Sequence, residues 1–188
     1  MSEKFREYIQ FFHEKHVYIP TKTIKLCGEV DENMYNIALS NIHALDSVNG
    51  TITIKLMSEG GSLSVGRAIY DIISLCKNEI RIVCYGEVVS AASIILQAAD
   101  LRIMSPNSKL MIHVGSESVP EDHPRNVDRL YEQHRIDEKW LEDIYLNKIK
   151  EKKKRFTRTQ LKDIMIFDKY FNAKEALDLG LVDKIGEF

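Results

Sequence analysis

The feature that most constrains this chain is a regular alternation of β-branched apolar runs with amphipathic runs between positions 51 and 113. The strand-like runs cover 51–57, 80–85, 101–104 and 109–113, and the helix-like runs cover 63–76 and 90–99. Turn residues, including Gly60, Gly61 and Gly86, separate several of these runs. Strand–helix alternation of this kind predicts an α/β fold with right-handed crossovers.

The flanking segments extend this pattern. Before it we expect a short amphipathic helix or ordered arm over 5–16, extended chain over 17–27, and a helix over 32–47 capped by Asp31. After it we expect a polar loop over 115–124, a short helix over 157–164, a helix over 173–179 capped by Asn172, and a last strand over 181–185.

A long charged helix is predicted over 126–155. It is too long to be covered by the core of so small a protein, so we expect it to project and to meet a partner subunit. The length of 188 residues suits a single domain over 1–188.

Composition narrows the classes of function. The formal net charge of -2 argues against a nucleic-acid-binding surface, and no window approaches the roughly 20 apolar residues of a membrane span. We see no signal peptide and expect a cytoplasmic protein. Cys27, Cys76 and Cys84 are interpreted as buried reduced thiols, and without metal-ligand spacing we expect neither metal nor cofactor.

Three side chains carry candidate chemistry, in the order serine, histidine, aspartate. Ser90 stands where a strand-like run meets a helix-like run, a place where helix amides favour a developing oxyanion. His113 ends a strand and has a side chain suited to general-base work, and Asp168 follows a short helix. Each has a structural alternative: a small packing residue, a structural histidine and a solvated cap.

Two backbone amides complete this candidate set. The pair Gly60 and Gly61 forms a simple turn or presents the unobstructed amide of Gly61 to a cleft, and Ala91 would supply a second donor. Ser93, one helical turn after Ser90, is expected to bond back to the backbone. We expect the other histidines to face solvent: His13, His16, His43, His123 and His134.

Four ordered segments then resemble a known family. They are 58–61 (SEGG), 86–91 (GEVVSA), 106–113 (PNSKLMIH) and the tail 167–183, which contains FDKY, AKEA and GLVD. Together they resemble the proteolytic subunit of the Clp protease (ClpP) over about 24–185. The resemblance implies a ClpP/crotonase-like superhelix of ββα units, with 126–155 as a projecting handle helix that joins two rings.

The resemblance also implies roles. Ser90 would be the nucleophile, His113 the base and Asp168 its orienter, with the Gly61 and Ala91 amides as the oxyanion hole. The enzyme would be a self-compartmentalising serine endopeptidase acting on peptides through an acyl-enzyme. It would form homo-oligomeric heptameric rings stacked as a tetradecamer, with an AAA+ unfoldase as partner and the bound peptide beside 115–125.

Several positions depart from the family pattern. Glu59 stands in place of a proline, Val88 and Val89 in place of alanines, and Ala91 in place of a methionine. The divergent arm 1–23 lacks the family's pore hairpin, which argues against the unfoldase partnership and fits a phage or mobile-element type. Two alternatives stay open: a catalytically silent ring or scaffold subunit, and a crotonase-like acyl-CoA enzyme.

Overall fold

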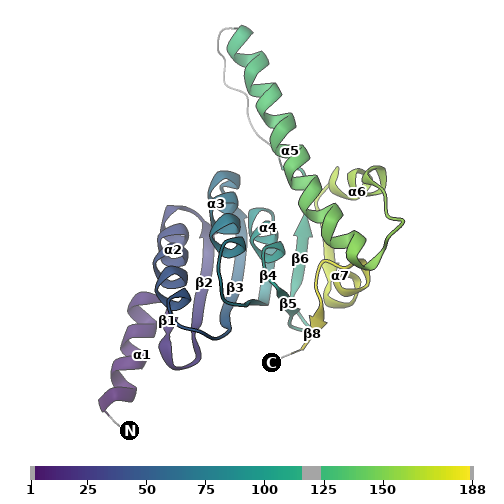
Figure 1. The fold of residues 1–188 in the computed structure, drawn as a ribbon. Coiled ribbons are helices and arrows are strands. Elements are labelled where there is room, and N and C mark those ends of the chain that lie inside the picture. Colours follow the sequence, from purple (N-terminus) through teal and green to yellow (C-terminus); the bar gives the residue numbers. More distant parts are fainter. Residues whose placement is uncertain (1–2, 116–123, 187–188) are drawn as a thin grey trace.

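A computed structural model describes residues 3–115 and 124–186 of the chain (Figure 1). The strands are β1 (Val17–Tyr18), β2 (Thr23–Val30), β3 (Ile52–Gly61), β4 (Ile80–Val89), β5 (Leu101–Met104), β6 (Lys109–Ile112), β7 (Lys169–Asn172) and β8 (Lys184–Ile185). The helices are α1 (Glu3–Lys15), α2 (Glu32–Asp46), α3 (Leu63–Ser74), α4 (Ala91–Gln97), α5 (Pro124–Lys152), α6 (Arg158–Met165) and α7 (Ala173–Leu179), with a short 3₁₀ turn, η1 (Ile19–Thr21).

The predicted α/β architecture is confirmed. Strands β2, β3, β4 and β5 pair in parallel, and the crossover helices α2, α3 and α4 stand side by side against the sheet (Figure 1). The sheet residues that face these helices are fully buried, among them Leu26, Ile54 and Ile82. Lys25 and Lys55 alternate with them and are half-buried, which is the period-two pattern of a strand with one covered face.

Two strands, β3 and β4, run further than the sequence indicated, and both contain glycine with positive φ. We expected β4 to end at a Gly86 turn and β3 to end before a turn over 58–62. Gly86 instead has a φ of +58° inside a continuous β4, which pairs with β5 over 81–84 and with β6 over 87–89. Because glycine adopts positive φ at little cost, the strand changes partner without ending.

The long helix α5 projects beyond the sheet, as predicted (Figure 1). It runs over Pro124–Lys152, slightly N-terminal to the expected 126–155. Its second half packs into the core through Leu141, Tyr145 and Ile149, whereas Tyr131 and Ile136 in its first half are more than half exposed. The helix therefore has one buried half and one half that this chain leaves uncovered.

The termini contain one confirmed helix and one strand that we missed. The described part of the N-terminal arm, from residue 3, forms α1, β1 and η1, and α1 buries none of its residues in this chain. Strand β7, which we did not predict, pairs antiparallel with β6. The expected cap of α7 is present as a capping box at Asn172. For α6 the sequence left Thr157 and Thr159 as alternative caps, and the capping box is at Thr157.

The cysteines only partly match expectation. Cys84 is buried and Cys76 is half-buried, but Cys27 is exposed, so the prediction of three buried thiols was wrong. Cys27 lies on β2 just before Gly28, where the register with β3 shifts and the strand turns its side chain outward. None of the helices among the described residues is both long and apolar enough to cross a membrane.

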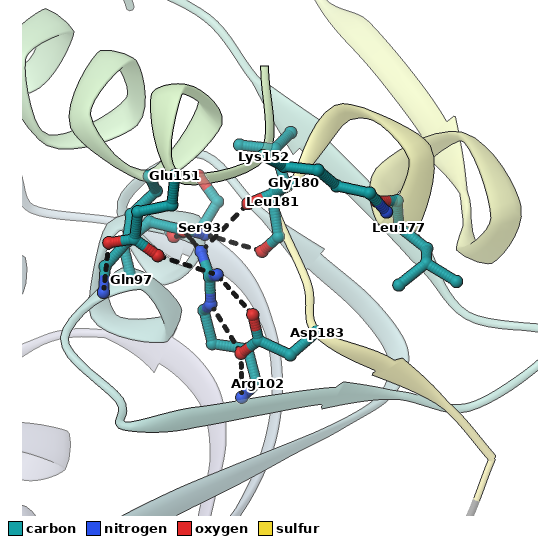
Figure 2. A network of polar contacts seen from close by, with 10 residues as sticks. Ser93, Gln97, Arg102, Glu151, Lys152, Leu177, Gly180, Leu181 and Asp183 are labelled. Atoms are coloured by element: carbon teal, nitrogen blue, oxygen red, sulfur yellow. Dashed lines mark hydrogen bonds and ion pairs between the residues drawn. The ribbon is translucent and has the colours of Figure 1, made fainter. Parts of the chain in front are cut away.

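A buried arginine joins α4, β5 and the C-terminal segment (Figure 2). The Arg102 guanidinium is held by both carboxylate oxygens of Asp183, with Nη2 to Oδ1 at 2.6 Å and Nε to Oδ2 at 3.0 Å. Its Nη1 donates to Gln97 Oε1 at 2.7 Å and to the Gly180 carbonyl at 3.1 Å. Burial favours the neutral carboxyl, but the hydrogen bonds from Arg102 hold the pKa of Asp183 below its ordinary value.

We expect Asp183→Ala to destabilise the fold by about 3–5 kcal/mol, because it leaves the buried charge of Arg102 without its partner. Glu151→Ala is the matched control: this carboxylate lies 4.0 Å from Arg102 but is 60% exposed. Its loss should change the free energy of unfolding by less than about 0.5 kcal/mol. Urea unfolding of both variants measures the difference, and equal losses would contradict the assignment.

Candidate active site

Ser90 occupies the junction between β4 and α4 in an unusual backbone conformation. Its φ is +54° and its ψ is -128°, a region that costs a non-glycine residue about 1–3 kcal/mol. Its amide donates to the Met111 carbonyl of β6 at 3.0 Å, and its hydroxyl makes no capping bond to α4. The strained turn therefore leaves the Ser90 hydroxyl available to a neighbour outside its own helix.

That neighbour is His113, and strand β7, which we did not predict, places Asp168 next to His113. Strands β6 and β7 are antiparallel, and Ile112 of β6 pairs with Lys169 of β7. The residue after Ile112, His113, therefore lies beside the residue before Lys169, Asp168. The distances are 2.7 Å from Ser90 Oγ to His113 Nε2 and 2.8 Å from His113 Nδ1 to Asp168 Oδ1. The structure thus brings together all three side chains that the sequence singled out.

The hydrogen-bond partners determine how the imidazole is arranged. A carboxylate can only accept, so the Nδ1–H of His113 donates to Asp168. In the neutral ring Nε2 is then an acceptor, and the Ser90 hydroxyl donates a hydrogen bond to it. The His113 side chain is 24% exposed and that of Asp168 is 62% exposed, so the chain of bonds runs from a sheltered serine to the surface.

Gly60 lies against Ser90 with no room for a side chain between them, a contact that the sequence analysis did not single out. A Cβ placed on Gly60 would lie 2.7 Å from Ser90 Cβ and 2.8 Å from the Val89 carbonyl oxygen, at a φ of +96°. The Gly60 amide is committed to Ser58 Oγ at 3.0 Å. Gly60 is therefore the residue whose missing side chain lets β3 support the serine.

Gly61 and Ala91 border the same space from two sides. Gly61 ends β3 with a φ of +146°, and a Cβ there would lie 2.6 Å from the Val30 carbonyl oxygen. The donor to that carbonyl is the amide of Ser62, at 2.9 Å. Ala91 is the first residue of α4, a position whose amide has no carbonyl one turn earlier in the helix to bond.

These residues line a cleft of about 480 Å³ between the N-terminal ends of α3 and α4 and the middle of α5. Gly61, Ser90, Ala91 and His113 all border it. Ile94 contributes an apolar wall. The α5 side of the cleft adds charged side chains, among them Asp137 and Glu138, so a bound substrate would meet both apolar and polar groups along its length.

An arginine that the sequence analysis missed ties α5 to the rim of this cleft. Arg67 of α3 pairs with Asp137 of α5 at 2.6 Å and lies 4.2 Å from the centroid of the Trp140 ring. Tyr70 packs edge-on against the same ring at 5.8 Å. The partners are separated by about seventy positions in sequence, so no local spacing signalled the contact.

The remaining expectations have mixed outcomes. Ser93 bonds back to the Ser90 carbonyl as predicted, at 2.6 Å, but its second partner, Tyr145, was missed. His134 lines the cleft instead of facing solvent. Within 3–115 and 124–186, three or more metal-binding side chains do not gather at one place. Most of the loop expected beside the peptide, 116–123, lies outside the described residues.

Comparison with known proteins places this geometry in a family. The family model described as Clp protease matches residues 10–188. The chain belongs to the Clp protease family. Its fold is also similar to that of a ClpP1 point mutant from Listeria monocytogenes, with a TM-score of 0.78 and 25% sequence identity over 90% of this chain and 94% of that chain. Family and fold together support a serine peptidase of the Clp type.

The Gly60 contact generates a stability prediction. We expect Gly60→Ala to lower the free energy of unfolding by about 1–3 kcal/mol more than Gly28→Ala does. This difference is the usual cost of forcing an extra methyl group into a packed site. Both glycines have a φ of +96°, but a Cβ at Gly28 meets nothing within 4 Å, so it isolates the backbone strain. Urea unfolding measures both; equal destabilisation would show that β3 does not press on Ser90.

Proposed function

We propose that this chain is a serine endopeptidase in which Ser90 is the nucleophile, His113 the general base and Asp168 the group that orients it. The observation that carries the proposal is the continuous hydrogen-bonded chain of 2.7 Å and 2.8 Å through these three side chains. A serine hydroxyl is a weak nucleophile until a neighbouring base accepts its proton, and this arrangement supplies that base.

In the proposed reaction Ser90 Oγ attacks the scissile carbonyl carbon while its proton passes to His113 Nε2. The resulting imidazolium is stabilised by the Asp168 carboxylate. The proton then goes to the leaving amine as the peptide bond breaks, which leaves an ester on Ser90. Water, deprotonated by His113, attacks this ester and returns the serine with release of the acid product.

We assign the oxyanion hole to the amides of Gly61 and Ala91. Both residues border the cleft beside Ser90. Ala91 contributes an amide at the first turn of α4, where the helix dipole favours negative charge. On the other side, the neighbouring amides of Gly60 and Ser62 are already bonded to Ser58 and Val30, which leaves Gly61 as the candidate donor from β3.

We further propose that the active form is a homo-oligomer of heptameric rings stacked as a tetradecamer, with α5 as the handle between rings. The family generally forms rings, and the uncovered half of α5 exposes Tyr131 and Ile136 by 52% and 59%. Such apolar exposure on a helix is relieved by a second copy. The sequence before β2 shows no recognisable pore hairpin, and its described residues include helix α1, so we predict that peptide processing does not require an AAA+ unfoldase. We further predict that this processing takes place in the cytoplasm.

The test is intact-mass spectrometry after treatment with a serine-reactive fluorophosphonate, read on the assembled oligomer. We expect a single adduct on the wild-type protein, no adduct on Ser90→Ala, and an unchanged adduct on Ser74→Ala, which alters an exposed serine far from the cleft. Peptide cleavage by Ser90→Ala should fall on the order of 10⁶-fold, the scale seen when a serine protease loses its nucleophile.

Two results would contradict the proposal. An adduct that persists in Ser90→Ala would assign the reactive serine elsewhere. An assembled wild-type ring that carries no adduct and cleaves no peptide would instead favour the silent scaffold.

A further inference from the structure

A second chain of hydrogen bonds reaches Ser90 from behind, through its backbone. The Ser90 carbonyl accepts from the Ser93 amide at 2.9 Å and from Ser93 Oγ at 2.6 Å. Ser93 Oγ also lies 2.5 Å from the Tyr145 hydroxyl of α5. Because the single hydroxyl proton of Ser93 goes to the carbonyl, Tyr145 must be the donor to Ser93.

This relay is almost completely buried, although Tyr145 borders the cleft. Ser93 is fully buried and Tyr145 is 1% exposed. Burial raises the pKa of the Tyr145 phenol, so the group remains a protonated donor throughout the range in which a protein works. A buried hydroxyl that loses its partner here finds no solvent to replace it, which makes each bond of the relay costly to break.

The peptide group that the relay holds is the one that carries a proposed oxyanion donor. The carbonyl of Ser90 and the amide of Ala91 belong to one planar trans peptide, so fixing the direction of the carbonyl fixes the opposite direction of the N–H. Ser90 has a ψ of -128° with a positive φ, a conformation that persists only where its surroundings hold it. A rotation of this plane would turn the Ala91 amide away from the cleft.

We propose that Tyr145 and Ser93 are positioning residues that aim the Ala91 amide at the oxyanion by holding the peptide plane between Ser90 and Ala91. This inference rests on the proposed function, since it gives the relay a role in the reaction of Ser90. Neither residue touches the substrate carbonyl in this scheme. They act through the backbone of the nucleophile.

The relay also joins the nucleophile to α5. Tyr145 projects from the buried half of α5, and Asp137 of the same helix pairs with Arg67 at the cleft. The other end of α4 is anchored separately, because Gln97 is held by Arg102 at 2.7 Å (Figure 2). With α4 fixed in this way, a shift of α5 at Tyr145 would be felt at the peptide plane of Ser90 and not absorbed by movement of the helix.

The experiment compares Tyr145→Phe, Ser93→Ala and the double variant in the full-length assembled protein. We expect Tyr145→Phe to lower both kcat for peptide cleavage and the rate of fluorophosphonate labelling by about fivefold, the scale of one lost hydrogen bond, with KM unchanged. Ser93→Ala should lose at least as much. The double variant should be no slower than Ser93→Ala, because Tyr145 acts only through Ser93.

Tyr70→Phe is the matched control. It removes a tyrosine hydroxyl at the junction of α3 and α5 while its ring contact with Trp140 remains, and it should react at the wild-type rate. Hydrogen exchange of the Ser93 amide provides a readout that needs no reaction. We expect it to quicken in Tyr145→Phe and to stay unchanged in Tyr70→Phe.

The outcomes separate the two proposals. If the wild-type protein is not labelled, the proposed function fails. Hydrogen exchange of the Ser93 amide then still tests whether Tyr145 holds Ser93 in place. If Tyr145→Phe matches the wild type in both labelling rate and Ser93 exchange, the relay is overturned. Additive losses in the double variant, or a loss confined to thermal stability, would also overturn it, because they would give Tyr145 a structural role independent of Ser93.

Discussion

The backbone of Ser90 is the constraint on which the candidate site depends. A serine with a φ of +54° keeps that conformation only if the chain on every side leaves it no cheaper alternative. Gly60 supports it from β3, the Met111 carbonyl fixes its amide, and Ser93 fixes its carbonyl. Three separate segments therefore hold one residue, and its hydroxyl remains free to bond His113.

The bent course of β4 follows from this constraint. The first part of β4 pairs with β5, but the residues that precede Ser90 pair with β6, and Gly86 makes the change of partner possible. The same β6 ends at His113 and pairs with β7 beside Asp168. Strand β6 thus fixes the positions of Ser90, through its backbone hydrogen bond to Met111, and of His113. Through its antiparallel partner β7 it also fixes the position of Asp168. A straight β4 would have separated the serine from this second group of strands.

The sequence was sufficient for features that depend on local pattern. Periodicity and capping residues predicted the crossover helices, and Asp31 and Asn172 cap the helices that they were expected to cap. Strand β7 was not predicted because three of its four residues are exposed, so its sequence shows no alternation of apolar and polar residues. Cys27 misled because an apolar neighbourhood in sequence does not tell which way a side chain points after a register shift.

Contacts across long separations were beyond sequence reasoning. Ser90 and His113 could be singled out because each stands at a recognisable junction of elements, whereas Asp168 gained its expected role from the family resemblance. Nothing local marks Gly60 as the residue under Ser90.

Tyr145, which meets Ser93 across more than fifty positions, is equally unmarked. In a helical pattern it reads as one more apolar position of α5. Its hydroxyl meets Ser93 only once α5 is packed against α4.

The packing of α5 against α4 divides the helix into a buried half and an exposed half. The inner half is held through buried residues such as Tyr145 and Leu141, while the outer half exposes Tyr131 and Ile136. Arg67 and Asp137 lie between the two halves at the cleft. After its first residue, α5 contains neither proline nor glycine, the residues at which helices most often kink. One continuous helix therefore carries both the exposed residues Tyr131 and Ile136 and the residue that contacts Ser93.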